Sequence, residues 1–306
     1  MHNLPSRPSR ASALRRALWL SFAFLFVPAL FSPRAALAAA IIVTTLEDVV
    51  ADDGLCSLRE AVANSNNNNQ QFASPGECAA GSGVDTISLP AGRIQLGPAG
   101  ALNVQKSTSF VGAGADASVI VGSAGNVAIS VYNGGGGGAL RPDAPDKTRA
   151  LNLYVFRDLT IAGGYYGIAL NDYQGDVLLE RVTVRDAEGY GLYASAATIV
   201  ISQSTFSGNA YYGILISSGS TQIIRSRIVD NPNAGANVSS DLAMSQTLVA
   251  GNGSTGLYLG YSGGTIVNSA FFDNQDAMSL SSRATLTNTN ILRNRGFTII
   301  KKYVRR

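Results

Sequence analysis

The chain has 306 residues, of which 14% are charged and 33 are glycine, and its formal net charge is +3. Five of the basic residues precede Ala39, and without them the balance becomes 18 basic minus 20 acidic residues, or −2. Six more basic residues crowd the C-terminus (Arg293, Arg295, Lys301, Lys302, Arg305, Arg306), so the body of the chain is acidic. Nucleic-acid binding would need a basic face on the body, and the composition excludes one.

Residues 1–38 have the layout of a secretory signal peptide. Arginines precede an apolar run from Ala17 to Phe31, and the small residues Ala36-Leu37-Ala38 follow it. A membrane anchor is the alternative, but the run is shorter than the roughly 20 apolar residues that span a bilayer, and Pro28 interrupts it. We therefore predict cleavage after Ala38. The mature protein would be secreted or lie at the cell surface or in the periplasm, without a membrane span.

The two cysteines, Cys56 and Cys78, lie near the start of the mature chain. In an exported protein, such an isolated pair is more often a disulfide than a metal site or two free thiols. The loop that they close would stabilise the fold by about 3 kcal/mol. The only histidine is His2, so none remains after cleavage.

A short amphipathic helix is expected from Ser57 to Ser65. Ser57 and Glu60 have the spacing of a capping box, and Leu58 and Val62 lie four residues apart. A solenoid exposes an apolar cross-section at each end, and a helix laid across it is a common cap. We interpret residues 39–84 as an N-terminal cap that contains the disulfide.

The segment from Cys56 to Ala61, CSLREA, resembles the CSLREA-type N-terminal domain of secreted bacterial parallel β-helix proteins. The segment from Asp85 to Gly92, DTISLPAG, is similar to the stretch by which that domain enters its first coils. The resemblance covers about residues 41–130. It implies export and a right-handed parallel β-helix of the pectin-lyase type, and it implies no particular activity.

From residue 150 onward, two apolar columns repeat with the same irregular spacing of 23, 22, 22, 21, 22 and 20 residues. The first column is Phe156, Leu179, Ile201, Ile223, Met244, Ile266 and Leu286, and the second is Ile161, Val184, Phe206, Ile228, Val249, Phe271 and Ile291. A third strand per coil is marked by Gly-apolar-x-apolar segments that begin at Gly167, Gly191, Gly213 and Gly256. Each period is therefore one coil of three short strands.

This pattern predicts an all-β protein, a right-handed parallel β-helix over residues 85–306 with a loop insertion at about 133–149. We expect nine or ten coils that rise about 4.8 Å each. Leucine-rich repeats have a similar period but need a leucine-dominated pattern, which is missing, and a propeller blade needs about twice the period.

Five asparagines occupy one column of the predicted coils: Asn209, Asn231, Asn252, Asn274 and Asn294. One interpretation of such a row of side-chain amides is a ligand-binding surface. Stacked amides also hydrogen-bond from coil to coil and to turn backbone that would otherwise lack partners. We interpret them as a structural ladder.

Tyr193 and Tyr258 occupy outward positions on the third strand, three coils or about 14 Å apart. Because sugar rings pack against aromatic faces, both are candidate glycan contacts. Tyr166, Tyr190 and Tyr212 occupy three consecutive coils, and for them we favour an aromatic stack folded over the edge of the core.

The leading hypothesis is an exported, monomeric, non-catalytic β-helix protein of the cell surface or matrix that binds a polysaccharide or another macromolecule, without cofactor or metal. The first alternative is a polysaccharide lyase, with Arg181 or Arg225 as the base and Asp172, Asp176 or Glu180 around a calcium ion. The histidine motifs of pectin hydrolases and uronan epimerases cannot be matched. The second alternative is a truncated piece of a longer surface or adhesin protein.

Overall fold

The computed structural model describes residues 39–132, 152–260, 262–299 and 304–305. The predicted signal peptide and the predicted loop insertion lie outside these residues. Within the described part of the chain, no helix is long and apolar enough to cross a membrane.

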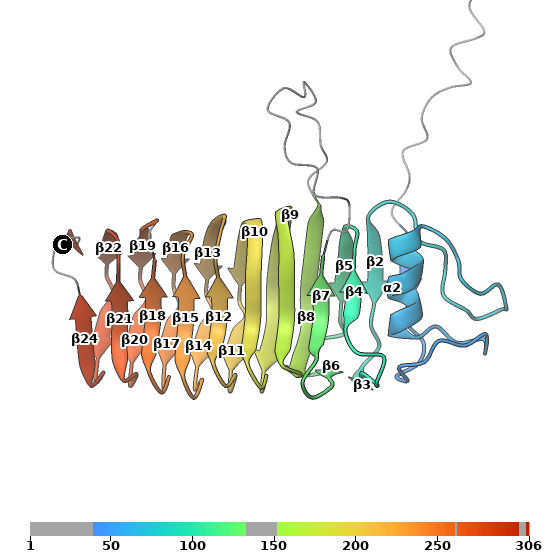
Figure 1. Cartoon of the computed structure of the whole chain (residues 1–306), viewed down its shortest axis with the longest axis horizontal. Helices are drawn as coiled ribbons and strands as arrows, with labels where there is room; N and C mark the ends of the chain where they lie inside the picture. Colours follow the sequence, from blue (N-terminus) through green and yellow to red (C-terminus); the bar gives the residue numbers. More distant parts are fainter. Residues whose placement is uncertain (1–38, 133–151, 261, 300–303, 306) are drawn as a thin grey trace, which may run out of the picture. The chain divides into compact units, whose positions relative to one another are not determined.

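The cap consists of β1 (Ala40–Ile42) and α2 (Leu58–Asn67). The helix begins as the sequence predicts, because the backbone N–H of Glu60 donates to Ser57 Oγ and the backbone N–H of Ser57 donates to Glu60 Oε2, at 3.2 and 2.9 Å. It ends at Asn67, two residues later than expected, and the C-cap Asn68 adopts the left-handed conformation. Figure 1 shows α2 beside β2 (Asp85–Ser88) and β4 (Leu102–Val104). Its residues Leu58, Ala61 and Val62 are buried in the core.

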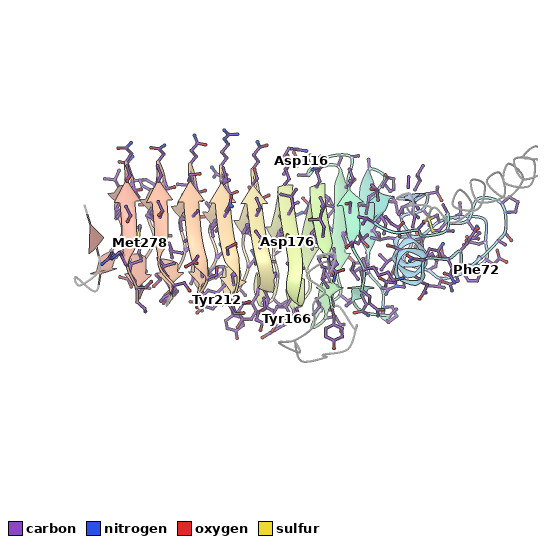
Figure 2. All side chains as sticks on the ribbon, turned by 90° about the horizontal axis from the view of Figure 1, so that it is seen from above. Phe72, Asp116, Tyr166, Asp176, Tyr212 and Met278 are labelled. Carbon is purple, nitrogen blue, oxygen red and sulfur yellow. A yellow bond between two sulfur atoms is a disulfide. The ribbon has the colours of Figure 1, made fainter. Side chains whose placement is uncertain are left out.

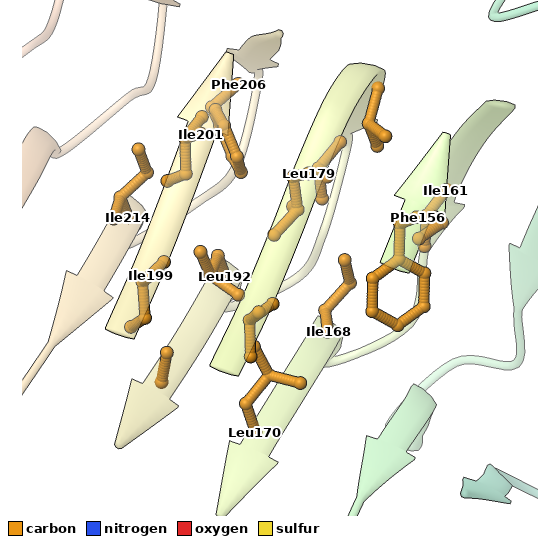
Figure 3. Packing of buried hydrophobic residues seen from close by; sticks show 14 of the residues in the cluster. Phe156, Ile161, Ile168, Leu170, Leu179, Leu192, Ile199, Ile201, Phe206 and Ile214 are labelled. Carbon is orange, nitrogen blue, oxygen red and sulfur yellow. The ribbon is translucent and has the colours of Figure 1, made fainter. Parts of the chain in front are cut away.

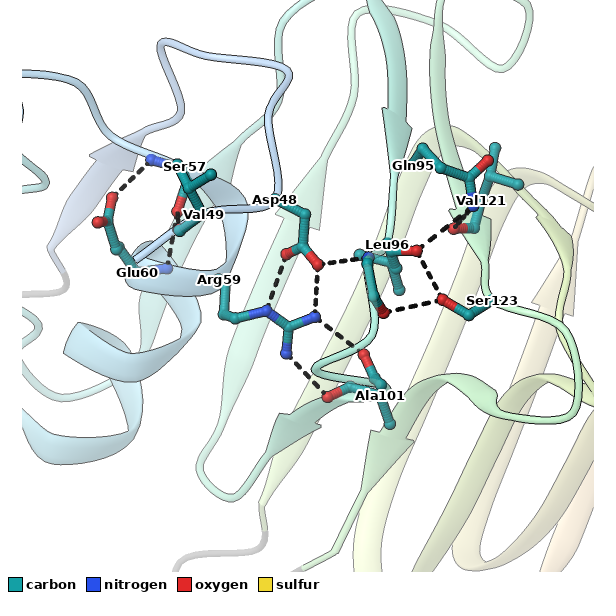
Figure 4. Close-up of polar contacts among 12 residues, drawn as sticks. Asp48, Val49, Ser57, Arg59, Glu60, Gln95, Leu96, Ala101, Val121 and Ser123 are labelled. Carbon is teal, nitrogen blue, oxygen red and sulfur yellow. Dashed lines mark hydrogen bonds and ion pairs between the residues drawn. The ribbon is translucent and has the colours of Figure 1, made fainter. Parts of the chain in front are cut away.

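Two connections fasten the cap. The predicted disulfide between Cys56 and Cys78 is present, and both residues are buried. In addition, Arg59 on α2 forms a bidentate ion pair with Asp48 at 2.8 Å and donates to the carbonyls of Gly100 and Ala101 (Figure 4). The pair therefore joins the helix to the turn between the first coil strands, β3 (Gly92–Gln95) and β4.

The coils stack three columns of parallel strands, and the predicted fold class is confirmed (Figure 1). The first column runs through β1, β2 (Asp85–Ser88), β5 (Thr108–Val111), β8 (Leu153–Gly163), β9 (Tyr166–Arg185), β10 (Tyr190–Ser202), β13 (Ser220–Ile224), β16 (Asp241–Ser245), β19 (Gly264–Val267), β22 (Ala284–Thr287) and β25 (Val304–Arg305). The second runs through β3 (Gly92–Gln95), β6 (Ser118–Gly122), β8, β9, β11 (Thr205–Ser207), β14 (Arg227–Val229), β17 (Leu248–Ala250), β20 (Ala270–Phe272) and β23 (Asn290–Leu292). The third runs through β4 (Leu102–Val104), β7 (Val127–Val131), β9, β10, β12 (Tyr212–Ile216), β15 (Ala234–Val238), β18 (Thr255–Leu259), β21 (Asp276–Leu280) and β24 (Gly296–Ile299).

The long strands β8, β9 and β10 contribute to more than one column because they continue around a corner of the coil. In the second column, nine strands are linked by eight steps, so the described residues make about eight turns. Nine strands in one column correspond to nine coils, within the nine or ten expected.

The predicted register is confirmed in both apolar columns. Phe156 pairs with Leu179 and Leu179 with Ile201, while Ile161 pairs with Val184 and Val184 with Phe206. These side chains point into the coil and are fully buried (Figure 3). In the coils nearer the cap, the rings of Phe110 on β5 and Phe156 on β8 are stacked, with their centroids 5.3 Å apart, and they continue the core.

The corners of the coils are formed by residues with positive φ, which glycine, asparagine and aspartate tolerate best. One corner follows the first column and contains Asp158, Arg181, Gln203, Arg225, Gln246, Asn268 and Asn288. The next corner follows the second column and contains Gly163, Asp186, Gly208, Asp230, Gly251, Asp273 and Arg293. The third column begins after this second corner.

Candidate functional site

The five column asparagines are joined by their side chains. Each Nδ2 donates to the Oδ1 of the next asparagine, at 3.1, 2.9, 2.8 and 2.9 Å from Asn209 to Asn294. Each Nδ2 also donates to a backbone carbonyl, as Asn252 does to Ile228. Since these amides are occupied within the protein, the column offers no free groups to a ligand.

The ladder also explains the glycine that opens the third strand of most coils. A Cβ atom at Gly213 would lie 2.9 Å from Nδ2 of Asn231 and 2.8 Å from the carbonyl oxygen of Gly235. The same is true of Gly191 beside Asn209. Glycine is therefore required where the third column passes the ladder.

The tyrosines of the third column form one continuous surface. We call it the tyrosine face and define it as Tyr165, Tyr166, Tyr190, Tyr193, Tyr211, Tyr212 and Tyr258. Figure 2 shows Tyr166 and Tyr212 projecting from the same side of the coils. Each member has a ring centroid within 6.5 Å of that of another member.

Three consecutive coils supply the centre of this face. The Tyr190 ring stacks on Tyr166 at 5.2 Å and on Tyr212 at 5.8 Å, with interplanar angles of 13° and 17°. These are the three residues for which the sequence favours a stack. They remain half-buried and so are accessible at the surface.

The two candidate glycan contacts belong to the same surface. Tyr193 lies 5.6 Å from Tyr166, and Tyr258 lies 6.3 Å from Tyr212, across the coil that carries the small residue Ala234. The strand register places Tyr193 and Tyr258 three coils apart, as expected. Both are half-buried because their rings pack against the stack.

Sequence reasoning missed Tyr165 and Tyr211, of which Tyr211 is 47% exposed. The signal was available, since Tyr-Tyr pairs precede the glycine in two coils. Burial, and then the neighbouring tyrosines, raise the pKa of the Tyr166 and Tyr190 hydroxyls above the usual value. At neutral pH the two phenols are therefore uncharged and able to donate a hydrogen bond.

Two of the residues considered for a lyase, Glu180 and Arg181, lie elsewhere and are engaged with one another. Glu180 forms ion pairs with Arg157 and Arg181, and Arg181 also holds Asp158 at 2.6 Å. Hydrogen bonds from Arg157 and Arg181 lower the pKa of Glu180, and Asp158 and Glu180 raise the pKa of Arg181. Arg181 is thus held in its charged form, which opposes the role of a base.

The other lyase candidates are also separated. Asp176 pairs in register with Leu153 and Thr198, so no second carboxylate flanks it in its column. Arg225 donates to Gln246 at 3.0 Å. The side chain of Asp172 lies outside the described residues, and among the described ones no three acidic, histidine or cysteine side chains are grouped to hold a metal.

A second surface feature is a shallow hollow of about 480 Å³ over the first column. Asp241 and Arg283 border it two coils apart, with Gly263 between them in the register, and Gln222, Thr265 and Thr285 line it. Most of its described lining residues carry polar side chains and none of them is aromatic, in contrast to the tyrosine face.

Two overlapping segments, residues 115–252 and 166–303, match the family model described as right handed beta helix region, and together they span more than half of the chain. No curated protein matches the sequence. Among solved structures, the chain is similar to the mannuronan C-5 epimerase AlgE6 A-module from Azotobacter vinelandii, with 16% identity and a TM-score of 0.45. The match covers 67% of this chain and 66% of that module, just under two thirds of it. This likeness carries no argument about activity.

Proposed function

We propose, since the chain belongs to the family of right-handed β-helix regions, that it is a non-catalytic binding protein whose tyrosine face holds glycan chains. The single observation that supports this function is the continuity of seven tyrosines over the coils from Tyr165 to Tyr258. Stacked aromatic rings present flat apolar area to the C–H faces of sugars, and free phenol hydroxyls add hydrogen bonds at the rim.

The proposal includes export of the protein to the cell surface or matrix as a monomer. The signal-like layout of residues 1–38, the disulfide of the cap and the CSLREA resemblance of Cys56 to Ala61 support it. Intact mass of the exported protein tests the processing step. We expect the mass of a chain that begins at Ala39. A mass that includes residues 1–38 would contradict cleavage.

The absence of catalysis is also part of the proposal. It is supported by the ion pairs that occupy Glu180 and Arg181. The rival function is a polysaccharide lyase, which would generate unsaturated uronates that absorb ultraviolet light. Incubation of the protein with polyuronates and calcium should produce no rise in this absorbance, and a steady rise would replace the proposal with the lyase.

The binding site is tested by Tyr193→Ala/Tyr258→Ala. We expect this double variant to lose oligosaccharide binding in calorimetry, because it removes a ring beside the central stack and the ring at the far end of the network. It should keep its melting temperature within a few degrees. A matched control is Gln222→Ala/Thr285→Ala, which removes two outward side chains from the hollow over the first column. Loss of binding in the control alone would move the site to the hollow.

A further inference from the structure

We infer that the tyrosine face selects neutral, extended glycans and rejects polyanionic ones. This inference rests on the proposed function and specifies the ligand of the same face. It follows from the charges on and around the tyrosines and from the direction in which the face runs.

The strands that carry the face contain no charged residue over five consecutive coils. The segments concerned are 166–171 of β9, 190–196 of β10, and the whole of β12, β15 and β18. A carboxylate of a bound polyuronate would therefore find no arginine or lysine on these strands to replace its water. Removing an anion from water without a partner is costly, so the face disfavours such a ligand.

Acidic residues lie at both ends of the face. Glu188 is exposed two residues before Tyr190, and its Oε2 accepts a hydrogen bond from the backbone of Gly125 at 2.9 Å. Asp276 lies in line with the stacked tyrosines along the coils. Tyr190 pairs with Tyr212 and Tyr212 with Ala234. The register of β15 with β18 then aligns Ala234 with Thr255, which pairs with Asp276. A polyanion laid along the face would meet like charge at each end, which opposes binding.

The basic side chains of these coils lie off the third column. Arg185 ends β9 and forms an ion pair with Asp186 at the corner between the second and third columns, and Arg227 lies on β14 in the second column. Arg157, Arg181 and Arg225 occupy or adjoin the turn between the first and second columns, and each is engaged with Glu180, Asp158 or Gln246. They are therefore not available to neutralise a ligand on the third column.

The direction of the face selects an extended chain. From the coil of Tyr166 to the coil of Tyr258 there are four steps, or about 19 Å at the spacing of parallel strands. A glycan with equatorial linkages presents flat C–H faces repeatedly along its length, so successive sugars can contact successive coils. A chain that coils tightly would touch only one or two rings.

A matched pair of ligands tests the inference, namely the β-1,4-linked hexasaccharides of mannose and of mannuronate. The two differ in having a hydroxymethyl group or a carboxylate on each ring, while the linkage is the same. In calorimetry at low salt we expect the mannose oligomer to bind at least about tenfold more tightly. Added salt should narrow this ratio, because it screens exposed charges.

The variant Glu188→Gln/Asp276→Asn removes the flanking charges while keeping side chains of similar size. We expect it to improve mannuronate binding by several-fold and to leave mannose binding nearly unchanged. An unchanged preference in the variant would overturn the role of the two acids. Mannuronate binding that is as tight as mannose binding, and is lost in Tyr193→Ala/Tyr258→Ala, would overturn the selectivity but leave the glycan site in place. If neither oligomer binds, the proposed function fails together with the inference.

Discussion

The side-chain amide of Asn252 donates to Oδ1 of Asn274 at 2.8 Å, and the backbone N–H of Asn252 donates to the same oxygen at 3.1 Å. One buried oxygen thus fixes both the side chain and the backbone of the neighbouring coil. The same double contact joins Asn231 to Asn252 and Asn209 to Asn231. The ladder therefore holds the register of successive coils at the start of their third strands.

The first prediction compares two positions of this ladder. Asn252→Ala should destabilise the protein more than Asn294→Ala, because the interior change removes both the acceptor of Asn231 and the side-chain donor to Asn274, whereas Asn294→Ala affects only Asn274 within the ladder. An unsatisfied buried group costs about 1 to 3 kcal/mol. Asn294 is half-buried, so water can replace part of its contacts. The free energy of unfolding in urea measures both, and equal losses would contradict a cooperative ladder.

The second prediction concerns the disulfide of the cap. Cys56→Ala/Cys78→Ala should lower the free energy of unfolding by about 3 kcal/mol, because the loop of the unfolded chain is no longer closed. The measurement is a denaturant melt of the oxidised protein and of the double variant. The oxidised protein treated with reductant under native conditions provides the control, since it loses the bond without a change of side chains. A double variant as stable as the oxidised protein would show that the disulfide contributes nothing to the stability of the fold.

The coil register could be predicted from the sequence because inward positions tolerate few residue types. Phe156, Leu179 and Ile201 must each fill the same layer of the core, so the irregular period appears in the sequence as two apolar columns. The capping box of α2 was visible for a similar reason, since Ser57 and Glu60 satisfy each other over a fixed local spacing.

The continuity of the tyrosine face could not be predicted in the same way. Ring contacts depend on side-chain rotamers, and the register neighbour of Tyr212 in the coil between it and Tyr258 is the small residue Ala234. The sequence therefore presented two separate sets of tyrosines. The ion pair of Arg59 with Asp48 also escaped prediction, because its carbonyl partners Gly100 and Ala101 lie more than 40 residues away and repeat in no column.

The third prediction concerns acid stability. Ion pairs with Arg181 and Arg157 lower the pKa values of Asp158 and Glu180 in the folded protein. A lowered carboxyl pKa stabilises the fold above the unfolded pKa of about 4, and this contribution is lost as the pH falls through the folded pKa. Arg181→Gln should therefore lower stability near neutral pH and have a diminishing effect below about pH 4.

Glutamine is a suitable replacement because Gln203 and Gln246 occupy the same corner with the same backbone conformation. The loss at neutral pH should be small, since the pairs are partly exposed and screened by salt. Urea melts of both proteins across the pH range measure it. If the difference in unfolding free energy between the two proteins grows as the pH falls, Arg181 does not stabilise the ionised carboxylates of Asp158 and Glu180.

The last prediction concerns the ion pair that joins the cap to the coils. The Asp48 side chain is 3% exposed, and its carboxylate accepts hydrogen bonds from Arg59 and from the backbone of Gly97, at 2.8 and 2.7 Å. Removing one partner of a buried pair leaves the other charge uncompensated, at a cost of about 3 to 5 kcal/mol. Asp48→Ala should therefore destabilise the protein strongly, and hydrogen exchange should increase first in α2 and β1. The control is Asp273→Ala, whose partner Arg293 is 66% exposed and whose loss should cost no more than about 1 kcal/mol. Similar small losses at both positions would show that water reaches the pair at Asp48, and that the disulfide and apolar packing hold the cap without it.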